Sequence, residues 1–438
     1  MTTLNRRQLL GLGLGAAAAV SLAACGDDDK GPAAATGNGG KDYTGPKVTL
    51  NLWNGFTGGD GDIFKKLVDQ FNAEHANIAI TVATYKWEDY YAKLPGAVSS
   101  GNGPDVAVMH MDMLATFAAR QVIQPVDDVA AALGLSESDF AATVWKGGIY
   151  HDKRYGIPLD MHPLGMYYNK TLFQQAGLDP AKPPTDRASF EAALAAFKKA
   201  GIQGFWISPF QFTGGMTGYS LVHQFGGSLY NDDATKAAFN SDQAVEAVTW
   251  CTKLVADGHS PANVGQDADY LALKSGKNAI NMNGIWQVND LKKSPEVQWG
   301  VAPLPQIGTK KAVWANSHNF TIVQQKKTDA NKVAGAKVFI NWLSQHSLDW
   351  AAGGQVPARN AVRDDPKFKE LTEISALAAE LPDAAFPPAA PGIGDVTNLF
   401  YTAFNEAVLG KKSPKQALDD GVAKADKLLE DNRKKYGS

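Results

Sequence analysis

The segment 155–170 reads Tyr-Gly-Ile-Pro-Leu-Asp-Met-His-Pro-Leu-Gly-Met-Tyr-Tyr-Asn-Lys, an extended apolar run that two prolines interrupt. Proline has no N–H for a strand ladder, and it holds the preceding residue extended. Pro158 and Pro163 therefore disfavour a core strand and predict a segment that crosses between two bodies. Asp160 and His162 lie between them, so a carboxylate and an imidazole are expected to face the gap. The segment by itself leaves open an edge strand with a solvated Asp–His pair.

Strands and helices alternate on the N-terminal side of this segment. Apolar and period-two runs predict strands at 47–53, 78–82 and 103–110, and helical spacing predicts helices near 63–71 and 87–94. This alternation is typical of a parallel α/β sheet, whose strand carboxyl ends form the usual ligand edge. Residues at such ends are Trp53, Asn54, Trp87, Met111 and Asp112.

A second α/β run follows the crossing segment. Strands are predicted at 204–207 and 278–286, and the strand at 204–207 opens into a loop of Phe, Gln, Thr and Gly at 208–216. Ser241 can cap a helix, and 314–322 is expected to cross back to the first body. A chain of 438 residues is long enough for two such bodies. Strand-exit tryptophans here are Trp206 and Trp286, whereas helical patterns place Trp145, Trp250, Trp342 and Trp350 in the core.

The N-terminus predicts export. Residues 1–24 combine Arg6-Arg7, a short apolar run and a small-residue end, which is the pattern of a cleaved signal peptide. The sequence Leu-Ala-Ala-Cys ending at Cys25 resembles a bacterial lipobox, which implies a lipid on the Cys25 thiol. The arginine pair is similar to a twin-arginine signal, and the route, twin-arginine or general export, stays open. Residues 25–46 have the composition of a flexible tether.

Composition and spacing exclude several classes of function. The net charge of −3 provides no basic field for nucleic acid. His110, His151 and His318 show no metal-ligand spacing with the carboxylates, so no metal site or cofactor is predicted. No nucleophile elbow, HExxH or P-loop is present, and no catalytic residue is assigned. Cys251 is expected to be a small buried hydrophobe.

The order of several short motifs along the whole mature chain carries a family resemblance. They are Val-Thr-Leu-Asn-Leu-Trp at 48–53, Gly-Pro-Asp-Val at 103–106, Ile-Pro-Leu-Asp at 157–160, Met-Tyr-Tyr-Asn-Lys at 166–170, Phe-Gly-Gly-Ser at 225–228, Leu-Lys-Ser-Gly at 273–276, Met-Asn-Gly-Ile-Trp at 282–286 and Gly-Gly at 353–354. In this order they resemble the family 1 extracellular solute-binding proteins of ABC importers, the maltose-binding-protein-like carbohydrate receptors.

This resemblance implies an α/β, two-lobed type II periplasmic-binding-protein fold with interleaved lobes and hinge crossings. The expected lobes are 47–158 with 317–365, and 159–316 with 366–438. The sequence residues that match ligand-facing positions are Trp53, Asn54, Trp87, Met111, Asp112, Asp160, His162, Trp206, Gly284, Trp286, Ser317, His318 and Arg359. The implied ligand is a mono- or oligosaccharide, because indole planes suit the apolar face of a pyranose and short polar side chains suit its hydroxyls.

The resemblance also implies how the protein is used. It implies a monomeric receptor without enzymatic activity, anchored to the outer face of the bacterial membrane through Cys25. This receptor closes around its sugar and delivers the sugar to ABC permease subunits. Two alternatives stay open. One is a secreted glycoside hydrolase using a carboxylate pair such as Asp112 and Asp160, and the other is a receptor that feeds a sensor kinase or an adhesin.

Overall fold

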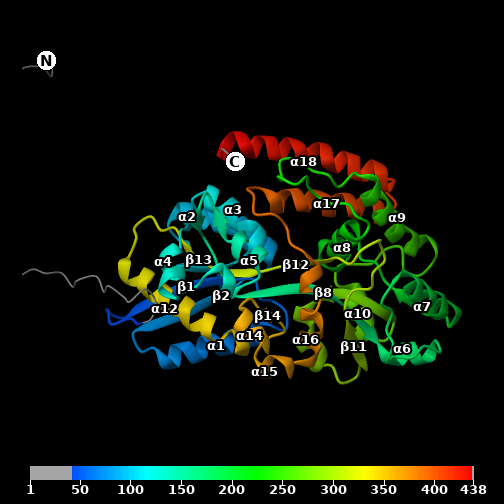
Figure 1. Cartoon of the computed structure of the whole chain (residues 1–438), viewed down its shortest axis with the longest axis horizontal. Coiled ribbons are helices and arrows are strands. Elements are labelled where there is room, and N and C mark those ends of the chain that lie inside the picture. The colour runs from blue at the N-terminus through cyan, green and yellow to red at the C-terminus, as the bar shows by residue number, and fades with distance from the viewer. Residues whose placement is uncertain (1–41, 437–438) are drawn as a thin grey trace, which may run out of the picture. The chain divides into compact units, whose positions relative to one another are not determined.

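Residues 42–436 of the chain are described in the computed structural model, and their strands form two large sheets and one small ribbon. The chain can be followed through these elements in Figure 1. The signal peptide and Cys25, and most of the expected tether, lie outside the described residues. Within the described part, no helix is both long and apolar enough to span a bilayer.

The first sheet is built mainly from the N-terminal strands. Its order is β2 (Ile78–Thr84), β1 (Val48–Asn54), β3 (Val106–His110), β13 (His318–Val323) and β4 (Ile123–Gln124), with β7 (Ile157–Pro158) also on β13. β1 is parallel to β2 and β3, whereas β13 is antiparallel to β3. The helices that accompany this sheet are α1 (Gly61–Glu74), α2 (Trp87–Ser100), α3 (Met111–Ala119), α4 (Asp127–Ala132), α5 (Ala142–Gly147), α12 (Ala330–Gln345) and α13 (Ser347–Ala351).

The second sheet is mixed and is organised on β8 (Asp160–Asn169). Its order is β15 (Ala384–Ala385), β12 (Val313–Asn316), β8, β10 (Asn278–Gly284) and β9 (Gln203–Phe205), with β11 (Trp299–Ala302) and β14 (Val356–Pro357) also on β8. Its helices include α6 (Lys170–Gln175), α7 (Arg187–Lys199), α8 (Met216–Gln224), α9 (Asp242–Ala256), α10 (Ala268–Lys274), α11 (Val288–Lys292), α16 (Thr372–Ala378), α17 (Ile393–Val408) and α18 (Pro414–Tyr436). The remaining elements are the ribbon of β5 (Ile149–Tyr150) and β6 (Lys153–Arg154), and the short helices α14 (Asn360–Arg363) and α15 (Pro366–Lys369).

Each sheet is buried on both faces. In the first sheet, Val106 and Val108 enter one apolar cluster while Ala107 and Met109 enter another. In the second sheet, Met166 and Tyr168 belong to one cluster and Tyr167 to a different one. This alternation follows from the period of two along a strand. The result is two lobes, each with its own core, which confirms the predicted two-lobed α/β fold.

The chain passes between the sheets at three places, of which two are neighbours, and the third lies between α13 and β14. Ile157–Pro158 pairs with the first sheet and Asp160–Asn169 with the second, so Leu159 lies at the crossing. The return crossing is at Ser317, between β12 and β13. The two crossings lie side by side because Asn316 pairs with His162. The crossing predicted for 155–170 is therefore confirmed.

The same segment also contains a core strand, contrary to the prediction from its prolines. All ten residues of β8 are buried, and partners lie on both of its edges. The ladder with β10 begins at Leu164, one residue after Pro163. Pro163 itself pairs only with Ala315 of β12. The missing N–H of the proline is tolerated because β10 does not reach it.

Several local predictions also agree with the structure. The Ser241 side chain accepts a hydrogen bond from the Ala244 N–H and caps α9. Cys251 is a fully buried free thiol. The four tryptophans predicted in the core, Trp145, Trp250, Trp342 and Trp350, are all buried. Sequence periodicity identified these positions because each faces the interior from a helix.

The buried carboxyl of Glu380 provides a pH test of the packing in the second lobe. Its Oε1 accepts a hydrogen bond from the Leu304 N–H at 2.6 Å, and burial raises the pKa of this carboxyl to about 8. Because the folded chain holds the proton more tightly than the unfolded chain, the stabilisation is complete below about pH 4.5 and is lost as the pH rises through about 8. We expect this group to lower the free energy of unfolding by up to about 1.4 kcal/mol per pH unit across that window.

Denaturant unfolding at several pH values measures this slope. Burial also raises the pKa values of Asp60 and Asp269 to about 6, so these carboxyls add a slope of the same sign. The contribution of Glu380 is therefore the free energy of unfolding of wild type minus that of Glu380→Gln. This difference should be nearly constant below pH 4.5 and should fall as the pH rises towards 8. The matched control is Glu370→Gln, at an exposed position. Parallel pH curves for wild type and Glu380→Gln would contradict the assignment.

Candidate functional site

A cavity of about 980 Å³ lies between residues of the two lobes. Its lining from the first lobe comes from the loop between β1 and α1, from the start of α2, and from the junction of β3 with α3. The second lobe contributes the segment Gln211–Gly215, the end of β10 and helix α17. His162, Asn316 and His318 of the crossing strands form its floor. The volume lies at the upper end of the range for small-molecule sites, about 300–1,000 Å³.

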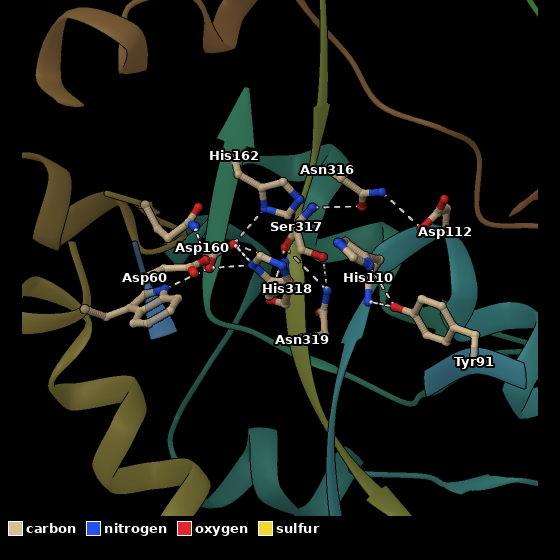
Figure 2. Close-up of polar contacts among 12 residues, drawn as sticks. Asp60, Tyr91, His110, Asp112, Asp160, His162, Asn316, Ser317, His318 and Asn319 are labelled. Atoms are coloured by element: carbon tan, nitrogen blue, oxygen red, sulfur yellow. Dashed lines mark hydrogen bonds and ion pairs between the residues drawn. The ribbon is translucent and has the colours of Figure 1, made fainter. Parts of the chain in front are cut away.

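Asp160 lies beneath this floor and holds it in place (Figure 2). It is fully buried, and its Oδ1 accepts from His162 Nδ1 at 3.1 Å and from the His318 backbone N–H at 3.0 Å. Its Oδ2 accepts from His318 Nδ1 at 2.9 Å and from Trp350 Nε1 at 2.7 Å. One carboxylate thus joins the outgoing crossing, the return crossing and helix α13.

The charges in this network follow from burial and pairing. Burial alone would raise the pKa of Asp160, but the interactions with His318 and His162 outweigh it and hold that pKa well below its usual range. Burial lowers the pKa of His162 to about 4, and it lowers the pKa of His110 well below the usual value. At neutral pH, Asp160 is therefore ionised while His162 and His110 are neutral.

Indole rings form the walls above the floor. Trp286, at the exit of β10, and Trp314, on β12, are nearly perpendicular with ring centroids 6.4 Å apart. Their ring centroids lie 6.1 and 5.9 Å from the centroid of the His162 ring. Across the cavity, Trp87 at the start of α2 stacks on His318 at 5.4 Å. The cavity therefore offers flat apolar surfaces from both lobes.

Polar side chains lie between these aromatic surfaces. Asp112 accepts a hydrogen bond from Asn316 Nδ2 at 3.0 Å, and burial raises the pKa of its carboxyl. Asp60 accepts from Gln355 Nε2 at 3.0 Å. The rest of the lining includes the uncharged polar side chains of Thr57, Tyr91, Gln211, Thr213, Gln266, Tyr270, Asn283, Gln287, Thr397, Asn398 and Tyr401. This set suits a ligand with many hydroxyl groups.

Among the described residues, acidic groups outnumber basic ones in the lining. The carboxylates are Asp60, Asp62, Glu88, Asp112, Asp267, Asp290 and Asp395, and the lysine and arginine side chains are Lys86, Arg120 and Lys293. Two of these cations are paired across the lobes, Lys293 with Asp62 at 2.6 Å and Arg120 with Asp395 at 3.5 Å. A negative cavity disfavours an anionic ligand.

Five of the thirteen residues assigned from the sequence line the cavity. They are Trp87, Asp112, His162, Trp286 and His318. The structure places the other eight outside the lining: Trp53, Asn54, Met111, Asp160, Trp206, Gly284, Ser317 and Arg359. Six of these eight residues lie within two positions of a lining residue in sequence, whereas Trp206 and Arg359 lie farther from any lining residue.

Local contacts keep these side chains out of the lining. Trp53 packs edge-on against Tyr85 with centroids 4.9 Å apart. Asn54 is buried, and its Oδ1 accepts from the Phe56 N–H at 2.9 Å. The side chains of Met111 and Ser317 are also buried. The backbone N–H of Trp206 donates to Asn278, Gly284 presents only backbone beneath the Trp286 ring, and Arg359 lies at an isolated bridge with Phe140.

Sequence reasoning missed other residues of the lining. His110 and Tyr91 were not assigned, although 103–110 was predicted to be a strand with a functional edge. The lining also includes Gln211, Phe212 and Thr213 of the loop 208–216. The mixture of aromatic and polar residues in this loop predicts no specific role. Tyr401 lies on α17, far along the chain, and nothing in its local pattern distinguishes it from a core residue.

Comparison with known proteins agrees with this geometry. A family model described as "Bacterial extracellular solute-binding protein" matches residues 66–376. The sn-glycerol-3-phosphate-binding periplasmic protein of Shigella dysenteriae (serotype 1, strain Sd197) is 25% identical over 410 residues, covering 87% of this chain and 92% of the relative.

Solved structures resemble the chain over most of its length. The cyclic alpha-maltosyl-1,6-maltose binding protein from Arthrobacter globiformis has a TM-score of 0.72 at 23% identity and covers 88% of this chain and 100% of its own. A structure described as "CpMnBP1 with Mannotriose Bound" has a TM-score of 0.71 at 26% identity and covers 86% and 100%. With the family model matching well over half of its residues, the chain belongs to the bacterial extracellular solute-binding proteins.

Proposed function

We propose that this extracytoplasmic protein binds a sugar, of oligosaccharide rather than monosaccharide size, and delivers it to the permease subunits of an ABC importer. The observation that carries the proposal is the pairing of indole planes from both lobes, Trp87 with Trp286 and Trp314, around a floor and rim of hydrogen-bonding side chains. An indole plane matches the C–H face of a pyranose, and amide, hydroxyl and carboxylate groups match its hydroxyl rim. The cavity volume of about 980 Å³ supports more than one sugar ring.

The charge of the cavity argues against a phosphorylated solute. A phosphate is normally bound by arginine, lysine or helix N-termini. Two of the three lysine and arginine side chains in the lining, Lys293 and Arg120, already face Asp62 and Asp395. The relative from Shigella dysenteriae is named for glycerol 3-phosphate. For the present chain, the acidic lining favours a neutral carbohydrate.

Hinge closure provides the mechanism of delivery. A ligand that contacts both walls stabilises the closed state by its differential affinity for that state. The crossings at Leu159 and Ser317 are the hinge points, and the lobes are 47–158 with 317–365 and 159–316 with 366–438 in this proposal. We further propose a monomer that is exported by the signal peptide 1–24, anchored through a lipid on Cys25, and separated from the membrane by the tether 25–46.

We propose binding without catalysis. A hydrolase would need two available carboxyl groups beside the scissile bond. Of the pair Asp112 and Asp160, only Asp112 lines the cavity. The oxygens of Asp160 accept hydrogen bonds from His162, His318 and Trp350. This pair therefore does not provide two available carboxyl groups, and we expect incubation with oligosaccharides to leave them uncleaved.

A thermal-shift panel tests the ligand class. We expect an oligosaccharide of glucose or mannose units to stabilise the protein, because a ligand at 100 times its dissociation constant adds about 2.7 kcal/mol to the free energy of unfolding. sn-Glycerol 3-phosphate should give no shift at the same concentration. Stabilisation by the phosphate and by none of the sugars would overturn the proposal.

Replacement of Trp286 tests the role of the indole walls. We expect Trp286→Ala to weaken binding of the best sugar by about 30-fold, or roughly 2 kcal/mol, because an aromatic side chain at the centre of a desolvated site carries much of the binding energy. Calorimetric titration measures the change. The matched control is Trp206→Ala, since Trp206 lies at a strand exit outside the cavity. Equal losses of affinity in the two variants would contradict the assignment.

A further inference from the structure

Three imidazoles converge on the cavity floor. One ring nitrogen from each of His110, His162 and His318 lies within 4.8 Å of those of the other two. All three side chains line the cavity, and Figure 2 shows them gathered between Asp160 and Tyr91. The spacing of these histidines along the chain gave no such indication, because three separate strands bring them together.

The sheet register explains the convergence. His110 is the last residue of β3 and pairs with His318, the first residue of β13. His162 on β8 pairs with Asn316, two residues before His318. The rings of His162 and His318 are stacked at 4.1 Å, and the ring of His110 lies 4.8 Å from that of His318. The cluster is thus fixed by backbone pairing in both lobes.

Hydrogen bonds on the far side of each ring define which nitrogen faces the cavity. The Nδ1 atoms of His162 and His318 both lie against the Asp160 carboxylate, at 3.1 and 2.9 Å. Nε2 is therefore the nitrogen of each ring that Asp160 does not contact. His162 Nε2 is buried and has no hydrogen-bond partner among the described residues. A buried imidazole nitrogen without a partner calls for a ligand.

His110 is held in a comparable way. Its Nδ1 lies 2.7 Å from the Tyr91 hydroxyl, which also accepts from the His110 backbone N–H at 2.9 Å. The hydroxyl can donate to Nδ1 or accept from it, according to the tautomer of the ring. The Nε2 atom of His110 is thus the ring nitrogen that Tyr91 does not contact.

We propose that His110, His162 and His318 bind one divalent transition-metal ion through Nε2, with zinc as the best match and a fourth coordination position open to the cavity. Histidines that bind metals usually donate their second N–H to a carboxylate or another acceptor, as two of these do to Asp160. Three imidazoles suit zinc and related ions, whereas calcium and magnesium prefer oxygen ligands.

Metal binding requires the three ring nitrogens to move closer together. Zn–N bonds of about 2.0–2.1 Å in a tetrahedral site place the nitrogens about 3.3 Å apart. The nitrogens lie at most 4.8 Å apart. His110 belongs to the first lobe and His162 to the second. The ion would therefore link the two lobes at the floor of the cavity.

Zinc titration of the chain without an affinity tag tests this site. The chain carries Cys25→Ser, which removes a thiol outside the described residues, and is first stripped with a chelator. Competition against a chromophoric zinc chelator should show one zinc per chain with a dissociation constant of about 1 μM or lower. Cobalt(II) should give the intense visible bands of a four-coordinate ion. Failure to bind either ion stoichiometrically would overturn the proposal.

Matched histidine variants assign the site. His110→Ala should weaken zinc binding by at least about tenfold. The control is His151→Asn, because His151 is exposed, has φ of 46°, and asparagine tolerates that backbone conformation. Zinc affinity equal to wild type in His110→Ala would overturn the proposal, as would an equal loss in the control. Thermal unfolding without metal verifies that both variants fold.

This test does not depend on the proposed sugar function. Zinc alone is the probe, and no carbohydrate is present in the titration. A protein that binds zinc but none of the sugar panel would refute the sugar proposal and leave the metal site standing. A protein that binds sugar but no zinc would refute the metal site and leave the sugar proposal standing.

Discussion

The buried carboxylate of Asp160 is the interaction on which the arrangement of the cavity depends. A buried charge costs several kcal/mol unless it is paired and hydrogen-bonded. Here the donors come from His162 on the outgoing crossing, from His318 on the return crossing and from Trp350 on α13. The requirement to satisfy one anion therefore holds two crossing segments and a helix in a single geometry. It also orients two imidazoles that face the ligand space.

The two lobes can move about this fixed point while they share its floor. The walls belong to different sheets, Trp87 to the first lobe and Trp286 to the second, whereas the floor belongs to the crossings. At the rims, the lobes meet through solvent-accessible ion pairs such as Lys293 with Asp62. Exposed pairs of this kind are worth about 0–1 kcal/mol. These ion pairs add little to the stability of the closed state, so the ligand that fills the space between the walls can decide which state is populated.

The sequence was sufficient for the fold and for part of the site. Pro158 and Pro163 indicated a crossing, and alternating strands and helices indicated the α/β lobes, because both features act through local backbone geometry. Strand ends also located Trp87 and Trp286. The position of Asp160 beneath the cavity floor could not be predicted, because one of its hydrogen-bond donors, Trp350, lies 190 residues away in the sequence. The histidine cluster was missed for the same reason: His110 and His318 meet only through the register of β3 with β13.

Small-angle X-ray scattering on one sample with and without its bound sugar tests the central claim most directly. If the crossings at Leu159 and Ser317 are hinges between lobes that close on a ligand, the radius of gyration should fall at saturation. The fall should be absent when the same concentration of a sugar that does not bind is added. A radius that stays constant while calorimetry shows the site to be filled would contradict the account.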